Sequence, residues 1–249
     1  MKLSASDLHI WHISLDNQTL IKHALSALPS TEETARTAQL THPKQQQCYV
    51  KTRWAMRNIL GHYLRIMPAE VQLRRTKLGK PELTPRAHAL DLRFNLSHSG
   101  NRALLAVTRK TEVGIDLMEI NQQPRPLALA KRYFTEETVA ELKKLPEIER
   151  QNALLRLWTQ YEAYKKAQGV GLRGGDQLLP LTIDLPTDKF QTLPTTANDI
   201  SPWLVTQINP AVGYVGAVVI ANNTALQIRH IDYDISATKQ DRLGSFTNK

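Results

Sequence analysis

Cysteine is almost absent from the sequence, since Cys48 is the single one among 249 residues. One cysteine excludes an internal disulfide and any metal site made of several thiolates, so we expect Cys48 to be a small core or boundary residue. No run of about 18 apolar residues could span a bilayer, and the first residues lack the apolar segment and cleavage site of a secretory signal. These absences argue against secreted and membrane-spanning classes and predict a cytoplasmic protein.

The motifs of several enzyme classes are missing as well. Ser97 and His98 lie in "SHSG", which lacks the G-x-S-x-G pattern of a nucleophile elbow, and neighbours on a strand point to opposite faces. The glycine-rich segment at 169–175 follows a helical pattern and lacks the Lys-Ser/Thr ending of a Walker loop. The 8 histidines form no H-x-x-x-H pair, so no zinc site is expected.

Positive charge is in excess, with 32 Lys and Arg against 23 Asp and Glu and a formal net charge of +9. Such an excess favours polyanionic partners, which include nucleic acids, phosphorylated metabolites and acidic proteins. The basic residues are scattered, without the dense blocks or interleaved aromatic residues of nucleic-acid platforms. A basic nucleic-acid-binding protein is therefore an alternative and not the expectation.

Hydrophobic periodicity and turn signals predict an α+β fold. Helical spacing is seen over 45–66, over 150–168 and over 127–145 with a break at Thr135, and a further helix begins near residue 30. Strands are predicted at 8–15, on both sides of "SHSG" within 90–108, and at 111–120, 181–185, 213–221 and 226–232. We interpret 73–83 as a turn-forming link, 186–202 as a surface connection and the polar end from Ser236 as frayed. This order suggests two similar α+β halves, residues 1–110 and 111–249.

Two carboxylates fall on surfaces that otherwise face a core. Asp116 shares one face of its predicted strand with Gly114, and Glu162 lies on the apolar stripe of the helix over 150–168, one turn before Lys166. An unpaired buried carboxylate is costly. Taken singly, Asp116 could cap a turn and Glu162 could pair with Lys166. Taken together, the three residues fit a Mg²⁺ site.

A Mg²⁺ site of this kind would use phosphate groups of a substrate, and cationic residues suited to phosphate lie in the first half of the chain. Arginine makes planar, bidentate phosphate contacts and lysine acts as a point charge. The candidates are Arg53, Arg57, Arg75, Lys80 and His98.

These residues lie in segments that together resemble one enzyme family, the 4′-phosphopantetheinyl transferases of the large, pseudo-dimeric Sfp-like group. The matching segments, in family order, are "RWAMR", "RRTKLGKPEL", "FNLSHSGNRALLAV", "VGIDLMEI", "AKRYF" and "LWTQYEAYKKAQGVGL". They cover roughly residues 50 to 172. Each segment alone is weak evidence for the family. The combination of motifs at these separations is specific for it, namely "GKP", "NLSHSG", "GID" and "W-T-x-x-E-A-x-x-K".

The resemblance implies transfer of the phosphopantetheine arm of coenzyme A to a serine of a carrier protein, with release of adenosine 3′,5′-bisphosphate. It implies a pseudo-dimer of two α+β halves with Mg²⁺ in the cleft between them. By motif, the metal ligands would be Asp116 and Glu162, the latter also a candidate general base, and Lys166 would stabilise pyrophosphate charge. Coenzyme A would be held by Arg53, Arg75, Gly79, Lys80, Ser97, His98 and Asp116. The implied partner is an acidic carrier protein, and the chain is expected to be a monomer without nucleic-acid or membrane partners.

The sequence departs from the family pattern at two positions. Met118 stands where many relatives have a second carboxylate, and Tyr161 stands where a lysine is commoner. Lys165 is the residue that we expect to supply the missing charge. A non-catalytic carrier-protein or nucleotide-binding module of the same fold is therefore the second hypothesis. The sequence does not identify the carrier, whose recognition is expected partly in the loop after Gly169.

Overall fold

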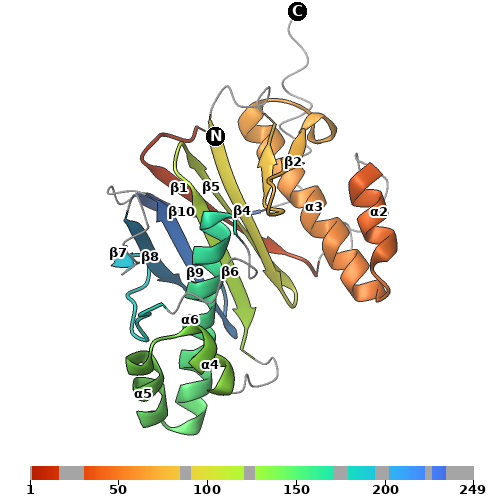
Figure 1. The fold of residues 1–249 in the computed structure, drawn as a ribbon. Coiled ribbons are helices and arrows are strands. Elements are labelled where there is room, and N and C mark those ends of the chain that lie inside the picture. Colours follow the sequence, from red (N-terminus) through yellow and green to blue (C-terminus); the bar gives the residue numbers. More distant parts are fainter. Residues whose placement is uncertain are drawn as a thin grey trace, which may run out of the picture.

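The computed structural model describes residues 2–16, 31–84, 91–120, 127–170, 179–193, 202–221 and 226–233. Within these ranges the chain forms two four-stranded sheets, a two-stranded hairpin and helices packed against the sheets (Figure 1). This confirms the predicted α+β class. No helix in the ranges above is long and apolar enough to cross a membrane. The predicted polar tail and most of the glycine-rich segment after Gly169 lie outside the described residues.

The first sheet has the strand order β10-β1-β5-β4. Its strands are β1 (Asp7–Ser14), β4 (Leu92–Ser99), β5 (Arg102–Arg109) and β10 (Gln227–Asp232). β1 pairs with β5 and β5 with β4 in antiparallel register, whereas β1 and β10 are parallel. The helix α3 (Pro43–Leu64) packs on this sheet, and α2 (Thr31–Gln39) lies beside α3. β10 follows the strands of the second sheet in the chain but joins this first sheet beside β1.

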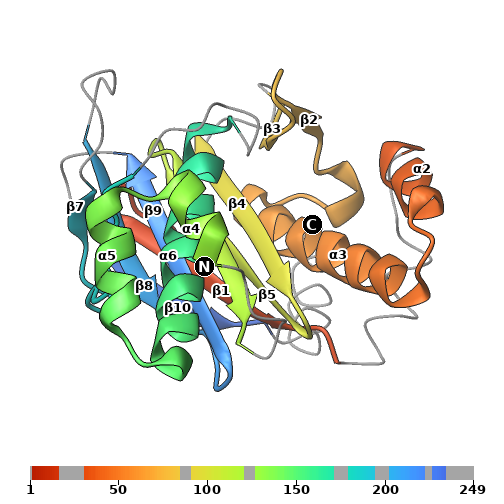
Figure 2. The ribbon, with the colours of Figure 1, turned by 60° about the horizontal axis from the view of Figure 1, so that its bottom comes forward.

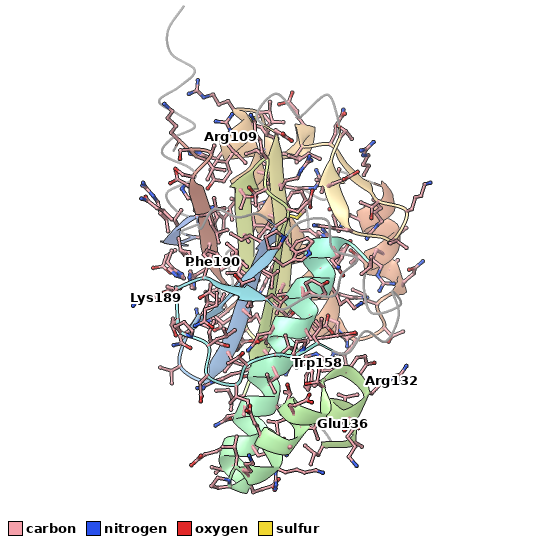
Figure 3. All side chains as sticks on the ribbon, turned by 60° about the vertical axis from the view of Figure 1, so that its left-hand side comes forward. Arg109, Arg132, Glu136, Trp158, Lys189 and Phe190 are labelled. Carbon is pink, nitrogen blue, oxygen red and sulfur yellow. The ribbon has the colours of Figure 1, made fainter. Side chains whose placement is uncertain are left out.

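The second sheet is antiparallel and has the order β6-β9-β8-β7. Its strands are β6 (Val113–Glu119), β7 (Gln191–Leu193), β8 (Trp203–Ile208) and β9 (Tyr214–Ala221). The helix α6 (Glu147–Gln168) crosses this sheet, and α4 (Leu127–Tyr133) and α5 (Glu136–Lys144) pack beside it (Figure 2). Thr135 accepts a hydrogen bond from the Thr138 amide at 3.5 Å and so caps α5 at the predicted break. Trp158 of α6 lies beside this helical pair (Figure 3).

Apolar side chains form layers that follow the alternation of each strand. On β5, Leu105 and Val107 pack with α3, while Leu104 and Ala106 pack with strands of the second sheet. On β6, Ile115 and Leu117 face the first sheet, and Met118 belongs to the core beneath α6. The layers are therefore helix, sheet, sheet and helix, and the side of β6 that carries Asp116 faces α6.

The predicted strand at 181–185 is wrong. Residues 183 and 184 form a turn, and prolines at 180 and 186 flank the segment and lack amide donors. Its carbonyl groups accept hydrogen bonds from helix side chains instead. Thr138 Oγ1 donates to the Leu181 oxygen at 3.1 Å, and Gln160 Nε2 donates to the Thr182 oxygen at 2.9 Å. The segment is a connection packed on the helices through Leu181, with Thr182 and Asp184 exposed, and it is not part of the sheet.

Three features of the fold were missed in the sequence. The first is β7, which lies within the segment 186–202 that was interpreted as a surface connection and pairs with β8. β8 is buried on both faces and so lacks the alternation that marks a half-exposed strand. The link at 73–83 contains two three-residue strands, β2 (Leu73–Arg75) and β3 (Pro81–Leu83), which form a hairpin, and the 3₁₀ turn η1 (Pro68–Glu70) precedes it. This hairpin carries Arg75, Gly79 and Lys80 toward the second half.

Candidate active site

The site begins where α6 lies directly against β6. Gly114 has no side chain, and a Cβ there would overlap the carbonyl oxygen of Ala163 and the amide nitrogen of Ala167. Small residues on both elements therefore allow the helix backbone to touch the strand. Asp116, two residues further along the same face of β6, is held opposite Lys166 by this contact.

Asp116 is the centre of the site and is 6% exposed. Its Oδ1 accepts hydrogen bonds from Lys166 Nζ at 2.6 Å and from Ser97 Oγ at 2.8 Å. Lys166 Nζ also donates to Ser97 Oγ at 3.1 Å and to the Ile115 oxygen at 3.3 Å. The carboxylate is thus paired as burial requires. Asp116 lies within β6, so the alternative that it caps a turn is wrong.

Glu162 lies one helical turn before Lys166 on α6 and is half-buried. Asp116 and Glu162 are oxygen donors of the kind that Mg²⁺ prefers, and Mg²⁺ commonly keeps several waters when one or two carboxylates hold it. Asp116 Oδ1 accepts two donors, which leaves further lone pairs on that carboxylate. Across the described ranges no three His, Cys, Asp or Glu side chains form a ready-made metal site. The donor set therefore fits a Mg²⁺ ion that is completed by water or by a substrate.

Three polar side chains on one face of β4 join the first half to β6. Asn95 Oδ1 accepts a hydrogen bond from the Ile115 amide at 2.9 Å, and Ser99 Oγ accepts one from the Glu119 amide at 3.0 Å. Ser97, between them, donates to Asp116. We missed Asn95 and Ser99 in the sequence, although the period-two pattern N-x-S-x-S in an apolar strand was a signal for them.

A cavity of about 360 Å³ opens beside this junction. It lies where α3, the β2–β3 hairpin, β4 and α6 meet. The structure brings most of the predicted coenzyme A residues into this one cavity, namely Arg53, Arg75, Gly79, Lys80 and His98, together with Lys166. Ser97 and Asp116 are tied to it through Lys166.

The two arginines of the cavity are held by local contacts. The Arg53 guanidinium lies 5.2 Å from the centroid of the Tyr49 ring on the same helix. Arg75 Nη1 donates to the Gly79 oxygen at 3.2 Å across the hairpin. Gly79 has φ +93°, a conformation that strongly favours glycine. The hairpin turn therefore depends on Gly79 to place Arg75.

His98 lies at the exposed edge of the cavity. Removal from water lowers the pKa of its imidazole below the ordinary value, and the positive charges of Lys166 and Arg53 lower it further, while Asp116 acts in the opposite direction. Its Nδ1 is 3.4 Å from Cys48 Sγ. Cys48 is half-buried, as expected, and burial raises the pKa of its thiol. The lowered pKa favours the neutral imidazole, and an added negative charge nearby would favour its protonation.

Two predicted phosphate ligands have other partners. Arg57 is 4% exposed, pairs with Glu33 at 3.0 Å and donates from Nη1 to the Val71 oxygen at 2.6 Å. Its role is structural, so the proposal of Arg57 as a phosphate ligand is wrong. Lys80 lines the cavity, but its ammonium contacts Glu112 and two carbonyl groups of the second half.

The departures from the family pattern lie in the core of the second half. Tyr161 is fully buried, and its ring is tilted against those of Tyr133 and Trp158, with ring centroids 5.0 Å and 5.8 Å apart. Met118 packs in the same core. The structure contradicts the expectation for Lys165, because this residue is 2% exposed and its Nζ lies 5.8 Å from the Tyr161 ring centroid, away from the residues that line the cavity. Position 161 is a packing position in this protein.

A carboxylate and lysine pair beside a basic cavity at the meeting of two sheets suits an enzyme that handles a phosphorylated ligand. Comparisons with known proteins agree with this class. Residues 112–219 match the sequence profile of the 4′-phosphopantetheinyl transferase superfamily, and residues 11–110 match the profile described as 4′-phosphopantetheinyl transferase, N-terminal.

Named relatives extend the match over most of the chain. The 4′-phosphopantetheinyl transferase HetI of Nostoc sp. is 34% identical over 222 residues, which cover 89% of this chain and 90% of HetI. A Synechocystis sp. protein with the provisional name 4′-phosphopantetheinyl transferase slr0495 is 36% identical over 71% of this chain and 70% of its own. The human L-aminoadipate-semialdehyde dehydrogenase-phosphopantetheinyl transferase is 31% identical over 62% of this chain and 52% of its own. The chain belongs to the 4′-phosphopantetheinyl transferase superfamily, which confirms the resemblance seen in the sequence.

Proposed function

We propose that the protein transfers the 4′-phosphopantetheine arm of coenzyme A to a serine of an apo carrier protein in a Mg²⁺-dependent reaction that releases adenosine 3′,5′-bisphosphate. The observation that carries this proposal is the contact of Asp116, Lys166 and Ser97 at the edge of a cavity lined by Arg53, Arg75 and His98. Membership of the superfamily supports the reaction class.

Asp116 and Glu162 would hold Mg²⁺, since both are hard oxygen donors on the faces of β6 and α6 that meet. When bound, the ion supplies positive charge to the pyrophosphate of coenzyme A. Lys166 is the residue positioned to share that task. Its side chain is 27% exposed and its ammonium contacts Asp116, so the ammonium can exchange this partner for a pyrophosphate oxygen without leaving the site.

Glu162 is the proposed general base. In the reaction the carrier serine oxygen forms a bond to the β-phosphorus, and the bond from that phosphorus to the bridging oxygen breaks. The electron pair leaves with adenosine 3′,5′-bisphosphate, and the serine proton goes to Glu162 directly or through one water. Because phosphoryl transfer depends mainly on position and charge, fixed cations account for most of the expected acceleration.

The cavity cations are proposed to bind the phosphates of coenzyme A. Arg53 and Arg75 offer planar donors, and His98 can add a proton when a phosphate arrives. Gly79 would let the hairpin backbone approach the nucleotide. The net charge of +9 suits an acidic carrier, since complementary charge speeds encounter. A monomeric state and a cytoplasmic location remain predictions.

The test is to incubate the full chain with coenzyme A, Mg²⁺ and a range of apo carrier proteins, and to weigh each carrier by mass spectrometry. We expect a gain of one phosphopantetheine, lost when Mg²⁺ is chelated. Glu162→Gln and Asp116→Asn should each slow transfer about 10²–10⁴-fold with unchanged circular dichroism. Coenzyme A binding without any mass gain across carriers would instead support the non-catalytic module. Near-normal transfer by either variant would remove that residue from the site.

A further inference from the structure

The Lys80 ammonium makes three polar contacts with the second half of the molecule. Nζ donates to Glu112 Oε2 at 2.9 Å, to the Ala167 oxygen at 3.0 Å and to the Val113 oxygen at 3.3 Å. An ammonium carries three donors, so these acceptors account for all of them. The side chain is 12% exposed, which places this cluster mostly out of solvent.

The two carbonyl acceptors lie at the ends of elements of the site. Ala167 belongs to the last turn of α6, where carbonyl groups lack partners within the helix and the helix dipole is negative. Val113 opens β6, three residues before Asp116. A cation here therefore stabilises the end of the helix that carries Lys166 and joins it to the start of the strand that carries Asp116.

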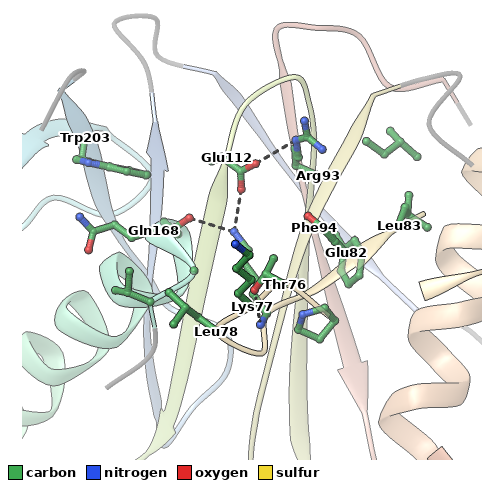
Figure 4. Close-up of a pocket in the computed structure, with 16 residues that line it drawn as sticks. Thr76, Lys77, Leu78, Glu82, Leu83, Arg93, Phe94, Glu112, Gln168 and Trp203 are labelled. Atoms are coloured by element: carbon green, nitrogen blue, oxygen red, sulfur yellow. Dashed lines mark hydrogen bonds and ion pairs between the residues drawn. The ribbon is translucent and has the colours of Figure 1, made fainter. Parts of the chain in front are cut away.

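Glu112 connects the same cluster to β4. Its Oε1 lies 3.1 Å from Arg93 Nε, and Arg93 Nη2 lies 3.1 Å from Asp91 Oδ1. The ion pair of Glu112 with Arg93 is drawn in Figure 4, which also shows the carboxylate turned toward the hairpin side. One carboxylate thus bridges a cation from the hairpin and a cation from β4.

The stem of Lys80 passes over the end of α6 at Gly169. This glycine has φ +75° and caps the helix, and a Cβ on it would lie 3.4 Å from Lys80 Cδ. Lys80 and Gly169 line both the 360 Å³ cavity and a second cavity of about 680 Å³ that extends to Trp203 (Figure 4). They are therefore part of the wall between the two cavities.

We propose that Lys80 is a positioning residue that clamps the β2–β3 hairpin to the end of α6, and that its ammonium is not a phosphate ligand of coenzyme A. The clamp fixes the cavity wall formed by Arg75 and Gly79 relative to Lys166 across the two halves. This inference rests on the proposed function for its effect on coenzyme A, whereas the clamp itself can be measured without any ligand.

Glu112→Gln distinguishes the clamp from direct phosphate binding because the two roles predict different changes in the KM for coenzyme A. If Lys80 bound phosphate, loss of the competing Glu112 charge would leave the KM for coenzyme A unchanged or lower it. If Lys80 clamps the hairpin, both Lys80→Met and Glu112→Gln raise this KM, by about tenfold for Lys80→Met, the size expected for loss of a charge-assisted contact. The double variant should be little worse than Lys80→Met, with kcat and the KM for the carrier within about twofold of wild type.

Hydrogen exchange of the free protein gives an independent readout. Amides at the end of α6, residues 165–169, should exchange faster in Lys80→Met and Glu112→Gln than in wild type. Lys77→Met, which removes a charge from the same hairpin, is the control and should change neither exchange nor KM. The Glu112 side chain is 45% exposed, so its variant is expected to fold.

An unchanged or lowered KM in Glu112→Gln, or unchanged exchange at 165–169 in both variants, would overturn the clamp. Absence of transfer by the wild-type protein would instead refute the proposed function. Hydrogen exchange at 165–169 would then be the test of whether Lys80 clamps the hairpin.

Discussion

Both halves of the molecule pack one long helix on a four-stranded sheet, but the helix lies closer to the sheet in the second half than in the first. Each places a helix of 22 residues on a four-stranded sheet, α3 in the first half and α6 in the second. Met56, Leu60 and Tyr63 fill the layer between α3 and its sheet, whereas Gly114 lets the backbone of α6 touch β6. The close contact fixes Lys166 against Asp116, and large side chains keep α3 further from its sheet.

The cations on the two long helices also differ in where their partners lie. Arg57 of α3 is satisfied by Glu33 and Lys51 of α3 by the Leu15 carbonyl, all within the first half. Lys166 of α6 reaches Ser97 on β4 and so crosses between halves. Both helices keep cations in the core, Arg57 and Lys51 on α3 and Lys165 on α6, but only α6 presents a partly exposed cation, Lys166, to the junction. The following variants test that division, beginning with the largest expected effect.

Arg57→Met should unfold more easily than any other variant described below. It removes one partner of the buried ion pair with Glu33 and the donor to the Val71 carbonyl, and breaking such a pair typically costs about 3–5 kcal/mol. Urea unfolding followed by circular dichroism measures this loss in the free energy of unfolding. Arg53→Met, four residues earlier on α3, is the matched control. We expect it to cost under about 1 kcal/mol, for its contact with Tyr49, and to raise the KM for coenzyme A. Equal stability losses in both variants would contradict the assignment of separate roles.

Gly114→Ala tests the close contact of the second half. The new methyl group must displace the backbone of α6 at Ala163, which should cost about 1–3 kcal/mol and lower kcat because Lys166 moves relative to Asp116. Gly213→Ala is the control, since Gly213 has φ +80° but no atom near its Cβ position. That substitution should cost about 1–2 kcal/mol through backbone strain while kcat stays unchanged. A normal kcat in Gly114→Ala would show that the spacing does not matter for the reaction.

The sequence allowed most helices and strands to be predicted because their apolar periodicity is local. Asp116 and Glu162 could be singled out as candidates because polar groups on apolar faces are conspicuous in a sequence. The predictions that failed concern residues whose roles depend on contacts with residues far away in the chain. Arg57 and Arg53 look alike in sequence and differ through Glu33, the orientation of Lys80 depends on Ala167, and Tyr161 is a core residue through Tyr133. β8 was missed because burial on both faces removes its pattern.

His98 should make coenzyme A binding depend on pH, and this is the smallest of the expected effects. The folded pKa of His98 lies below its ordinary value of 6.5, so without ligand the residue stabilises the fold above about pH 6.5, and this contribution is lost as pH falls through the lowered pKa. A bound phosphate adds negative charge and raises that pKa. Binding therefore takes up a proton, and the KM for coenzyme A should fall as pH falls from 7.5 to about 6.

The measurement is the ratio of the KM of His98→Asn to that of wild type at each pH, which cancels the titration of coenzyme A itself. We expect the ratio to rise about three- to tenfold toward acid, because one pKa unit corresponds to a factor of ten in affinity. Cys48→Ser, which alters only the neighbour of His98 Nδ1, serves as the control and should keep the wild-type pH dependence. A ratio that stays constant with pH would show that His98 remains neutral in the complex, and the cations of the cavity would then act on the phosphates without it.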